Sequence, residues 1–332
     1  MAASATTHPT LVDLVKRSDP DGKIATIAEI LNETNEILDD MVWVEGNLPT
    51  GHRTTIRAGI PTPTWRKLYG GVQPTKSTTV QVTDNTGMLE AFAEVDKALA
   101  DLNGNTSDFR LSEDAPHIEG MNEEVADTLF YGNEGTEPEA FTGLAPRFNS
   151  TSADNGENVI LGGGSGSDNA SIWLIVWGPN TIHGIIPKGS VGGLHMEDMG
   201  KVVIENVDGL GGRMVAYRSH YKWDCGITVR DWRYCVRIAN IDRSALTVDA
   251  ASGANLPDLM FQALERIPNL ATGRAAFYMD RTVTTKLRQQ HTNGVASSTL
   301  TMENLGGTMI TSFHGVPVKR VDALAGDEAT IS

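Results

Sequence analysis

A stretch of about forty residues, 47–87, limits what this chain can fold into. It reads NLPTGHRTTIRAGIPTPTWRKLYGGVQPTKSTTVQVTDNTG, is rich in Thr, Gly and Pro, and has too few apolar residues for a core of its own. Two runs within it, Arg53–Ala58 and Ser77–Thr83, have the composition of β-strands. Long excursions of this kind inside a globular chain are usually functional or disordered. We therefore expect an extended hairpin arm that packs on another molecule, because such contacts satisfy its backbone without a private core.

The rest of the 332-residue chain has the composition of a folded globular protein. Hydrophobic residues make up 40% and charged residues 21%, which excludes intrinsic disorder over most of the length. The longest unbroken apolar run, Ile172–Trp177, is far shorter than the ~20 residues of a membrane span. The N-terminus lacks the basic start and apolar stretch of a secretory signal, and two cysteines are too few for a disulfide framework or a zinc site. We expect a soluble chain made in the cytoplasm.

Charge is distributed unevenly along the chain. The net charge of −15 argues against a protein that binds nucleic acid tightly through its phosphates. Residues 43–87 hold five basic and two acidic residues, whereas residues 88–139 hold 14 acidic and two basic ones. Identical copies that dock on one another use such opposite patches to set their register. The alternative is a solvated acidic helix face beside an ordinary loop.

The pattern of apolar residues predicts helices early in the chain and strands later. Helical spacing is found at 23–41, at 88–102 and at 112–131, where Ser112 is a candidate N-cap. Residues 132–169 are loop-like. The expected later elements are strands at Ser171–Trp177, Lys201–Val207, Arg213–Tyr221, 227–238, Ala275–Met279 and Val316–Val321, and helices at 256–267 and 281–290. The predicted fold class is α+β.

Two glycine-rich stretches resemble nucleotide-binding loops only superficially. LGGGSGS at 161–167 lacks the Gly-Lys-Ser/Thr ending of a phosphate loop and precedes a strand, so we expect a surface loop. The glycines of 202–214 miss the spacing of a dinucleotide-binding turn and are followed by a β-run, so we expect a turn between strands.

Catalytic and metal-binding patterns are absent from the sequence. His195 with Glu197 and Asp198 comes closest to a ligand cluster, but a polar loop beside a helix is the simpler interpretation. Cys225 and Cys235 are interpreted as small core or sheet residues. The remaining candidates for paired carboxylates are interpreted as facing solvent or another subunit: Glu123, Glu124, Glu134, Glu137 and Glu139. We expect no catalytic residue, no cofactor and no metal site.

Four phrases, taken in order, resemble one protein family. They are NLPTGHRTTIRAGIPTPTWRKLYGGV at 47–72, FRLSED at 109–114, LFYGNEGTEPEAFTGLAPRFN at 129–149 and FHGVPVKRVDAL at 313–324. The ordered set resembles the major capsid (coat) proteins of tailed double-stranded DNA bacteriophages. The nearest likeness is to those of short-tailed phages (podoviruses), a Bordetella podophage among them.

The resemblance implies an HK97-like capsid fold with peripheral and axial domains. It assigns residues 1–46 to an N-terminal arm and helix and residues 47–87 to the extended β-hairpin loop. Residues 88–169 would form a helical peripheral domain that contains the long spine helix. Residues 170–332 would form a strand-rich axial domain together with returning peripheral strands.

The resemblance also implies a structural protein that self-assembles into hexamers and pentamers of the icosahedral head enclosing the DNA. The chain would be assembled in the host cytoplasm and reside in the virion. Expected partners are itself, a separate scaffolding protein, a portal protein and a cement or decoration protein, with packaged DNA held loosely. The basic arm and the acidic helix would form the two halves of one intersubunit contact. Its candidate residues are Arg53, Arg57, Trp65, Arg66, Lys67 and Tyr69 on the arm and Glu119, Glu123, Glu124 and Asp127 on the helix.

Two alternative functions stay open at this point. An α+β hydrolase would need a cleft that unites acids of 113–139 with His117 or a later histidine. Another virion component, such as a decoration or tail-tube protein, would lack the pairing of arm and acidic helix.

Overall fold

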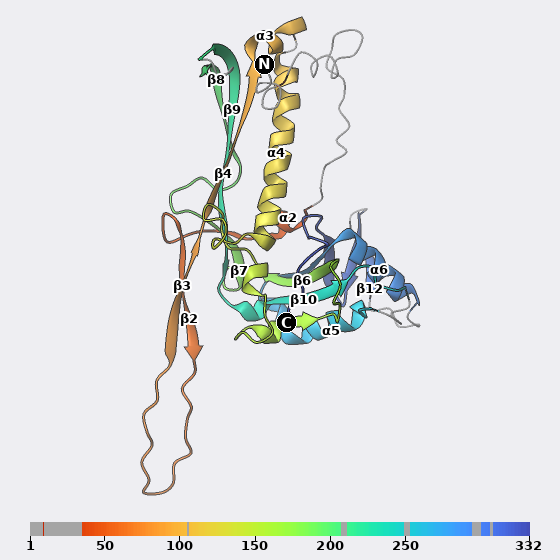
Figure 1. The fold of residues 1–332 in the computed structure, drawn as a ribbon. Coiled ribbons are helices and arrows are strands. Elements are labelled where there is room, and N and C mark those ends of the chain that lie inside the picture. The colour runs from red at the N-terminus through yellow and green to blue at the C-terminus, as the bar shows by residue number, and fades with distance from the viewer. Residues whose placement is uncertain are drawn as a thin grey trace. The chain divides into compact units, whose positions relative to one another are not determined.

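A computed structural model describes residues 9, 35–104, 106–206, 211–248, 253–293, 300–305 and 308–332 of the chain (Figure 1). The helix predicted at 23–41 lies mostly outside these residues, and its end contains the short helix α2, Ile37–Asp40. The chain divides into two compact units. The first holds residues 1–34, 88–126 and 191–224, and the second holds 35–87, 127–190 and 225–332.

The second unit is built around strand β6, Asn169–Trp177, in which every residue is buried. Its neighbours β10, Cys235–Asp242, and β11, Arg274–Met279, both run antiparallel to it. The sheet continues through two parallel pairs, β5 (Val159–Leu161) on β10 and β14 (Val316–Arg320) on β11. Because the run IWLIVW has no polar face, a strand buried on both sides was expected here, and the structure confirms it.

The outer strands extend this sheet in both directions. Beyond β14 follow β13, Thr308–Phe313, and β12, Leu300–Leu305, each antiparallel to its neighbour. Strand β7, Ile182–Ile186, pairs parallel with β1, Trp43–Glu45, and antiparallel with the end of β9, which spans Arg213–Val229. The backbone N–H of Gly46 then donates to Ile186 at 2.7 Å, so the chain leaves the sheet beside β7.

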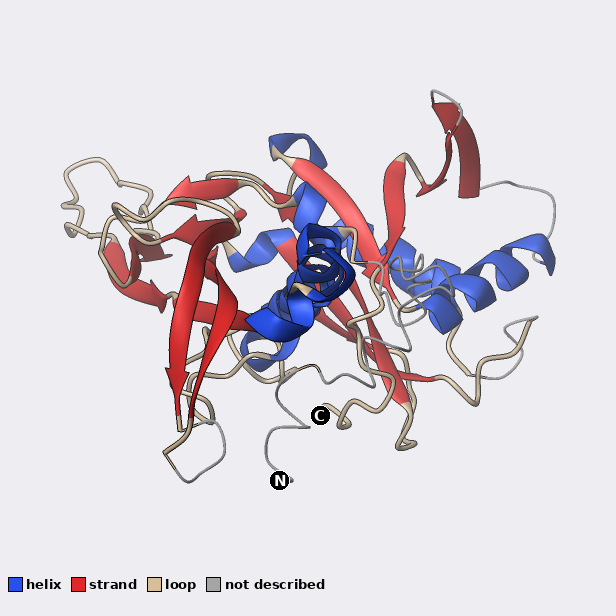
Figure 2. Cartoon of the chain, turned by 90° about the horizontal axis from the view of Figure 1, so that it is seen from above, coloured by secondary structure: helices blue, strands red, loops and turns tan. Residues whose placement is uncertain are grey.

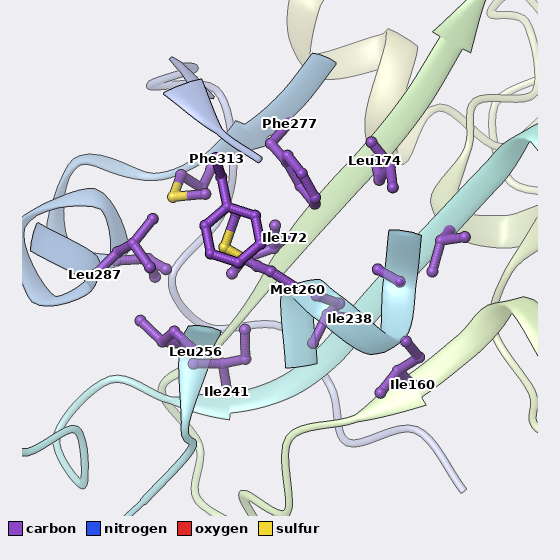
Figure 3. Close-up of a cluster of buried hydrophobic side chains, with 14 of the residues drawn as sticks. Ile160, Ile172, Leu174, Ile238, Ile241, Leu256, Met260, Phe277, Leu287 and Phe313 are labelled. Atoms are coloured by element: carbon purple, nitrogen blue, oxygen red, sulfur yellow. The ribbon is translucent and has the colours of Figure 1, made fainter. Parts of the chain in front are cut away.

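Helices α5, Leu256–Arg266, and α6, Arg281–Asn293, supply apolar side chains to the core on one face of the sheet. Figure 3 shows Met260 of α5 and Leu287 of α6 gathered with Phe277 of β11, all fully buried. The Asn255 side chain accepts the Asp258 N–H to cap α5, and the Asp280 carboxylate accepts the Thr282 N–H at 3.1 Å at the start of α6. Both helices agree with the sequence prediction.

An aromatic cluster lies around Trp173 of β6. The ring centroids of Phe130 and Phe148 lie 5.9 and 6.1 Å from that of Trp173. The Arg237 guanidinium lies 5.0 Å from the Trp173 ring, within the range of a cation–π contact. Since β6 carries apolar side chains on both faces, this cluster buries the residues that α5 and α6 do not reach.

The first unit combines a β-ribbon with most of a long helix. Strand β8, His195–Glu205, pairs antiparallel with β9, from His195 opposite Lys222 to Glu205 opposite Arg213. Strand β4, Gly87–Asp96, is the other neighbour of β9, and the short helix α3, Lys97–Ala100, follows it. Helix α4 runs unbroken from Thr106 to Tyr131 and is seen end-on in Figure 2.

Short 3-10 turns connect elements in both units. One, Leu102–Gly104, lies in the first unit, and the others lie in the second, at Ala145–Arg147, Gly156–Asn158, Trp232–Tyr234 and Leu270–Thr272.

The helix predicted at 88–102 is wrong, because most of it is strand β4. Leu89, Ala91, Ala93 and Val95 alternate with more polar or exposed positions, which is the two-residue period of a strand. On the opposite face Glu94 accepts a hydrogen bond from Arg218 of β9 at 2.6 Å, so pairing with β9 fixes the strand.

Two other boundaries differ from the prediction. Helix α4 begins at Thr106 rather than near Ser112, whose hydroxyl donates to the Phe109 carbonyl inside the helix. The strand predicted at 227–238 is interrupted, because the Asp231 carboxylate accepts the Arg233 N–H and starts a 3-10 turn. The short strands β1, β5 and β7 were not predicted. No helix of the described residues is long and apolar enough to cross a membrane.

Candidate subunit interface

Residues 51–85 form a two-stranded hairpin, here called the hairpin arm. Strands β2, Gly51–Gly59, and β3, Thr78–Asn85, pair antiparallel, with an irregularity between Arg57 and Gly59. The loop 60–77 continues beyond the end of this ladder (Figure 1). The strands predicted at 53–58 and 77–83 are therefore confirmed, and the arm has no layer of its own to bury its side chains.

The loop of the hairpin arm exposes large apolar side chains. Ile60, Trp65, Leu68 and Tyr69 have exposed fractions of 85%, 99%, 92% and 103%. The turn that carries them is held locally, since Arg66 Nε donates to the Gly70 carbonyl at 3.0 Å. Contiguous exposed apolar surface on a folded chain marks an interaction site. This loop therefore has the surface of a contact with another molecule.

The predicted basic residues of the arm are also exposed. Arg53 is fixed by the Asn47 side chain, which accepts its backbone N–H at 2.7 Å, and its guanidinium donates to Thr83 at 3.3 Å. Arg57 lies on β2 and Lys67 lies in the loop, both at the surface. All six arm residues named from the sequence are thus accessible in the single chain.

The base of the hairpin arm is anchored by a buried carboxylate, Asp84. Arg147 Nη1 donates to Asp84 Oδ1 at 2.7 Å, and the Thr228 hydroxyl donates to its other oxygen. The same guanidinium donates to the carbonyls of Gly143 and Thr142 at 3.1 and 3.0 Å. Sequence reasoning missed these anchoring residues, because they lie far apart in the chain. The arm consequently has a fixed base and an exposed loop.

The predicted acids of the helix all lie on α4. Glu124 and Asp127 are exposed, and Glu119 and Glu123 are half-buried. Glu119, Glu123 and Asp127 follow one another at four-residue spacing, which places their carboxylates along one face of the helix. Like charges at this spacing repel one another. A cation docked beside such a row would relieve this repulsion.

The residues considered for metal binding lie elsewhere and do not form a site. His195, Glu197 and Asp198 lie on strand β8, so the polar loop expected there is wrong. Asp198 accepts from Arg110 at 2.7 Å, and this hydrogen bond holds the pKa of Asp198 below its usual value. Within the described part of the chain, no three His, Cys, Asp or Glu side chains are grouped as metal ligands.

The acids proposed for a hydrolase have structural contacts. Asp114 is buried and accepts from the Ser219 hydroxyl at 3.3 Å, while Glu134 accepts from Asn85 at 2.5 Å. The His117 ring stacks on Tyr221 with centroids 6.5 Å apart. A groove of about 1060 Å³ beside the arm is lined by residues such as Ile56, Val82 and Trp232, and by none of the acids of 113–139.

Two minor predictions from the sequence agree with the structure. Residues 162–168 form the loop between β5 and β6, as expected for LGGGSGS. Cys225 and Cys235 are buried free cysteines in strands β9 and β10. The turn expected within 202–214 lies partly outside the described residues, since 207–210 are not among them, and it is flanked by β8 and β9.

Comparison with known proteins identifies the family. The family described as Major capsid protein GP7 matches residues 19–332. The chain belongs to this family. A major capsid protein is a structural subunit of the phage shell, so the protein resides in the virion and is not an enzyme. The resemblance to tailed-phage coat proteins, noted from four phrases of the sequence, is confirmed.

The chain is similar to several solved structures. A chain of the cryo-EM structure of bacteriophage Epsilon15 is 43% identical, with 100% of this chain and 99% of that chain covered and a TM-score of 0.77. The bacteriophage JBD30 capsid is 9% identical over 88% of this chain and 91% of its own, with a TM-score of 0.48. The holo-SrpI encapsulin complex from Synechococcus elongatus is 12% identical over 70% and 96%, with a TM-score of 0.44. The major capsid protein has the HK97-like fold predicted from the sequence, as its similarity to the Epsilon15 chain shows. No curated protein sequence matches the chain.

Proposed function

We propose that this major capsid protein assembles into the hexamers and pentamers of an icosahedral head around double-stranded DNA. The hairpin arm of one copy docks on the acidic face of helix α4 of the next copy. The observation that carries this proposal is the exposure of Trp65 and Tyr69, at 99% and 103%, in a loop whose own chain buries neither. Aromatic side chains that are exposed in the subunit and buried on association dominate the energy of many interfaces.

Charge supports the same pairing of surfaces. The arm contributes cations, including Arg53, Arg57, Arg66 and Lys67, and the first half of the chain carries its acids mainly in residues 88–139. Opposite charges steer two copies together and suppress wrong registers, although rim charges add little affinity by themselves. In this proposal the aromatic residues supply the affinity, and the acids of the helix select the orientation: the row Glu119, Glu123 and Asp127, with the neighbouring Glu124.

Other parts of the chain receive roles in the same proposal. Helix α4 is the spine helix of a peripheral domain in 88–169. Residues 170–332 supply the strand-rich axial domain, around which hexamers and pentamers close, together with returning strands of the peripheral domain. A separate scaffolding protein, a portal protein and a cement or decoration protein are the further partners. The net charge of −15 suits a container that has to release its DNA, because few phosphate contacts need to be broken.

The test is a charge reversal on the arm with a matched control. Arg66→Glu with Lys67→Glu is expected to abolish shells while leaving a folded, soluble subunit, as measured by light scattering behind a sizing column and by negative-stain imaging. Lys188→Glu with Arg274→Glu makes the same change of charge at exposed positions outside the arm and is expected to leave assembly intact.

A compensating reversal makes the test specific for this pair of surfaces. Adding Glu123→Lys and Glu124→Lys to the arm variant restores opposite signs and is expected to recover shells. Normal shell yield from the arm variant would overturn the docking of the arm. Failure of the control to assemble would show that net charge, rather than the arm, controls assembly.

A further inference from the structure

Two histidines at the base of the hairpin arm have buried nitrogens without a hydrogen-bond partner. His52 lies on β2 and His183 on β7, and their rings meet edge to face with centroids 5.7 Å apart. His183 is fully buried, and its Nδ1 lies 3.1 Å from the Gly184 carbonyl. Among the described residues, nothing hydrogen-bonds to His183 Nε2 or His52 Nδ1. Buried polar atoms in this state are costly, so the pair requires an explanation.

The strand registers show what this pair connects. His52 lies opposite Asp84 across the hairpin, and His183 lies opposite Thr228 across the sheet. Two contacts join the pair His52–Asp84 to the pair His183–Thr228. The Thr228 hydroxyl donates a hydrogen bond to Asp84, and the two imidazole rings contact each other. We call these four residues the arm root. The root is where the hairpin arm attaches to β7 and β9.

The charged groups around the root favour neutral imidazoles. Asp84 is the carboxylate that acts electrostatically on both histidines, but Arg147 already pairs with it. Arg230, which follows β9, adds a second cation. On β1 the Glu45 carboxylate accepts from the Gly189 N–H at 3.1 Å. Burial lowers the pKa of His52, and the charge of Arg230 adds to this while Asp84 opposes it. Burial also lowers the pKa of His183 against the raising effect of its hydrogen bond to the Gly184 carbonyl, with smaller lowering contributions from His52 and Arg230 and a small raising one from Asp84.

We infer that the arm root is a pH-sensitive hinge, in which protonation of His52 and His183 releases the hairpin arm from β7 and β9. The docked arm holds fewer protons than the released one, in which the histidines return to the ordinary value of about 6.5. Docking is therefore fully stable above that pH and is lost as the pH falls below it. Two new cations beside Arg147 and Arg230 would face one carboxylate, Asp84. This device acts on the arm of a single copy and does not depend on which surface the loop docks on.

Hydrogen exchange of the full-length, unassembled chain tests the hinge, with rates corrected for the intrinsic effect of pH. Between about pH 7.5 and about pH 5, peptides covering 51–59 and 78–85 are expected to lose protection, because a two-stranded hairpin released from β7 and β9 is only marginally stable in water and its ladder opens. Peptides from β6, 169–177, are expected to keep theirs, because they lie in the sheet core. The variant His52→Gln with His183→Gln cannot be protonated at these positions and is expected to keep the arm protected at both pH values.

Three results would overturn the hinge. The first is equal protection of the arm at both pH values, and the second is a loss of protection in the double variant as large as in the unaltered chain. The third is a loss of protection that extends to β6, which would mean general acid unfolding. If the double variant is unfolded at about pH 7.5, His52→Gln alone replaces it, since that side chain is only partly buried. This single variant is expected to reduce the loss of protection, and an unchanged loss would contradict the proposal.

Discussion

Arg237 Nη2 donates to Glu328 Oε2 at 2.8 Å, and both side chains are buried. The same carboxylate accepts hydrogen bonds from the hydroxyls of Ser171 and Tyr131, the latter at 2.6 Å. Strand β10, strand β6 and the end of helix α4 are thereby joined to a residue only a few positions from the end of the sequence. Asn240 adds a second attachment, since its side chain exchanges two hydrogen bonds with the backbone of Ile331, at 2.7 and 2.9 Å.

Removing one partner of this buried pair should be costly. Arg237→Met leaves the Glu328 carboxylate buried without its cation, and we expect a loss of about 3–5 kcal/mol in the free energy of unfolding. Replacing both residues, Arg237→Met with Glu328→Leu, should recover part of that loss because no unpaired charge is left. Urea unfolding of the unassembled chain measures both. A cost below about 1 kcal/mol for Arg237→Met would mean that the pair behaves like an exposed one.

Two glycines should respond in opposite directions to the same substitution. A Cβ at Gly143 would lie 2.6 Å from the Thr128 carbonyl oxygen and 2.8 Å from that of Leu129, so Gly143→Ala forces backbone to move. We expect a loss of about 1–3 kcal/mol. At Gly120, on helix α4, an added Cβ would meet no atom within 4 Å beyond its chain neighbours and the backbone of its own helix turns, and Gly120→Ala should gain about 0.5–1 kcal/mol. Urea unfolding of both variants checks this. Changes of the same sign in the free energy of unfolding would contradict the packing described at Gly143.

The aromatic residues of the arm should matter for assembly and not for folding. Trp65→Ala with Tyr69→Ala removes side chains that contact nothing in the single chain, so the stability of the unassembled chain should change by less than about 0.5 kcal/mol. Shell yield should fall sharply. Val191→Ala trims a side chain that is 70% exposed outside the arm and serves as the control. Loss of assembly in the control, or normal shells from the aromatic variant, would contradict the claim that the aromatic residues of the loop are specifically required for assembly.

Those parts of the fold with strong local signals could be predicted from the sequence. The run IWLIVW leaves no polar face and so requires a buried strand, and the helices predicted at 256–267 and 281–290 are found as α5 and α6. The hairpin arm could be predicted because its long stretch rich in Thr, Gly and Pro has too few apolar residues to form a core. The exposure of its six candidate residues followed directly from that.

The remaining features depend on partners far away in the chain. The three-residue spacing of Leu89 and Phe92 fits a helix as well as a strand. Strand β4 forms because its backbone pairs with β9, a partner far away in the sequence. The arm root joins His52 to His183 and Asp84 to Arg147, and no spacing in the sequence relates these residues. Short strands such as β7 carry too few residues for a periodic pattern, although β7 is the strand against which the arm is anchored.

Covalent cross-linking of assembled shells tests the docking of the arm most directly. Shells are assembled from a mixture of isotopically heavy and normal chains and treated with a carbodiimide, which joins lysines to carboxylates in contact. We expect peptides that link Lys67 or Lys76 to the acids of 119–127, with heavy and normal halves mixed, because the proposed docking joins the arm of one copy to the helix of another. Links from these lysines only to acids elsewhere, or only between halves of one isotope, would contradict an arm that docks on the neighbouring helix.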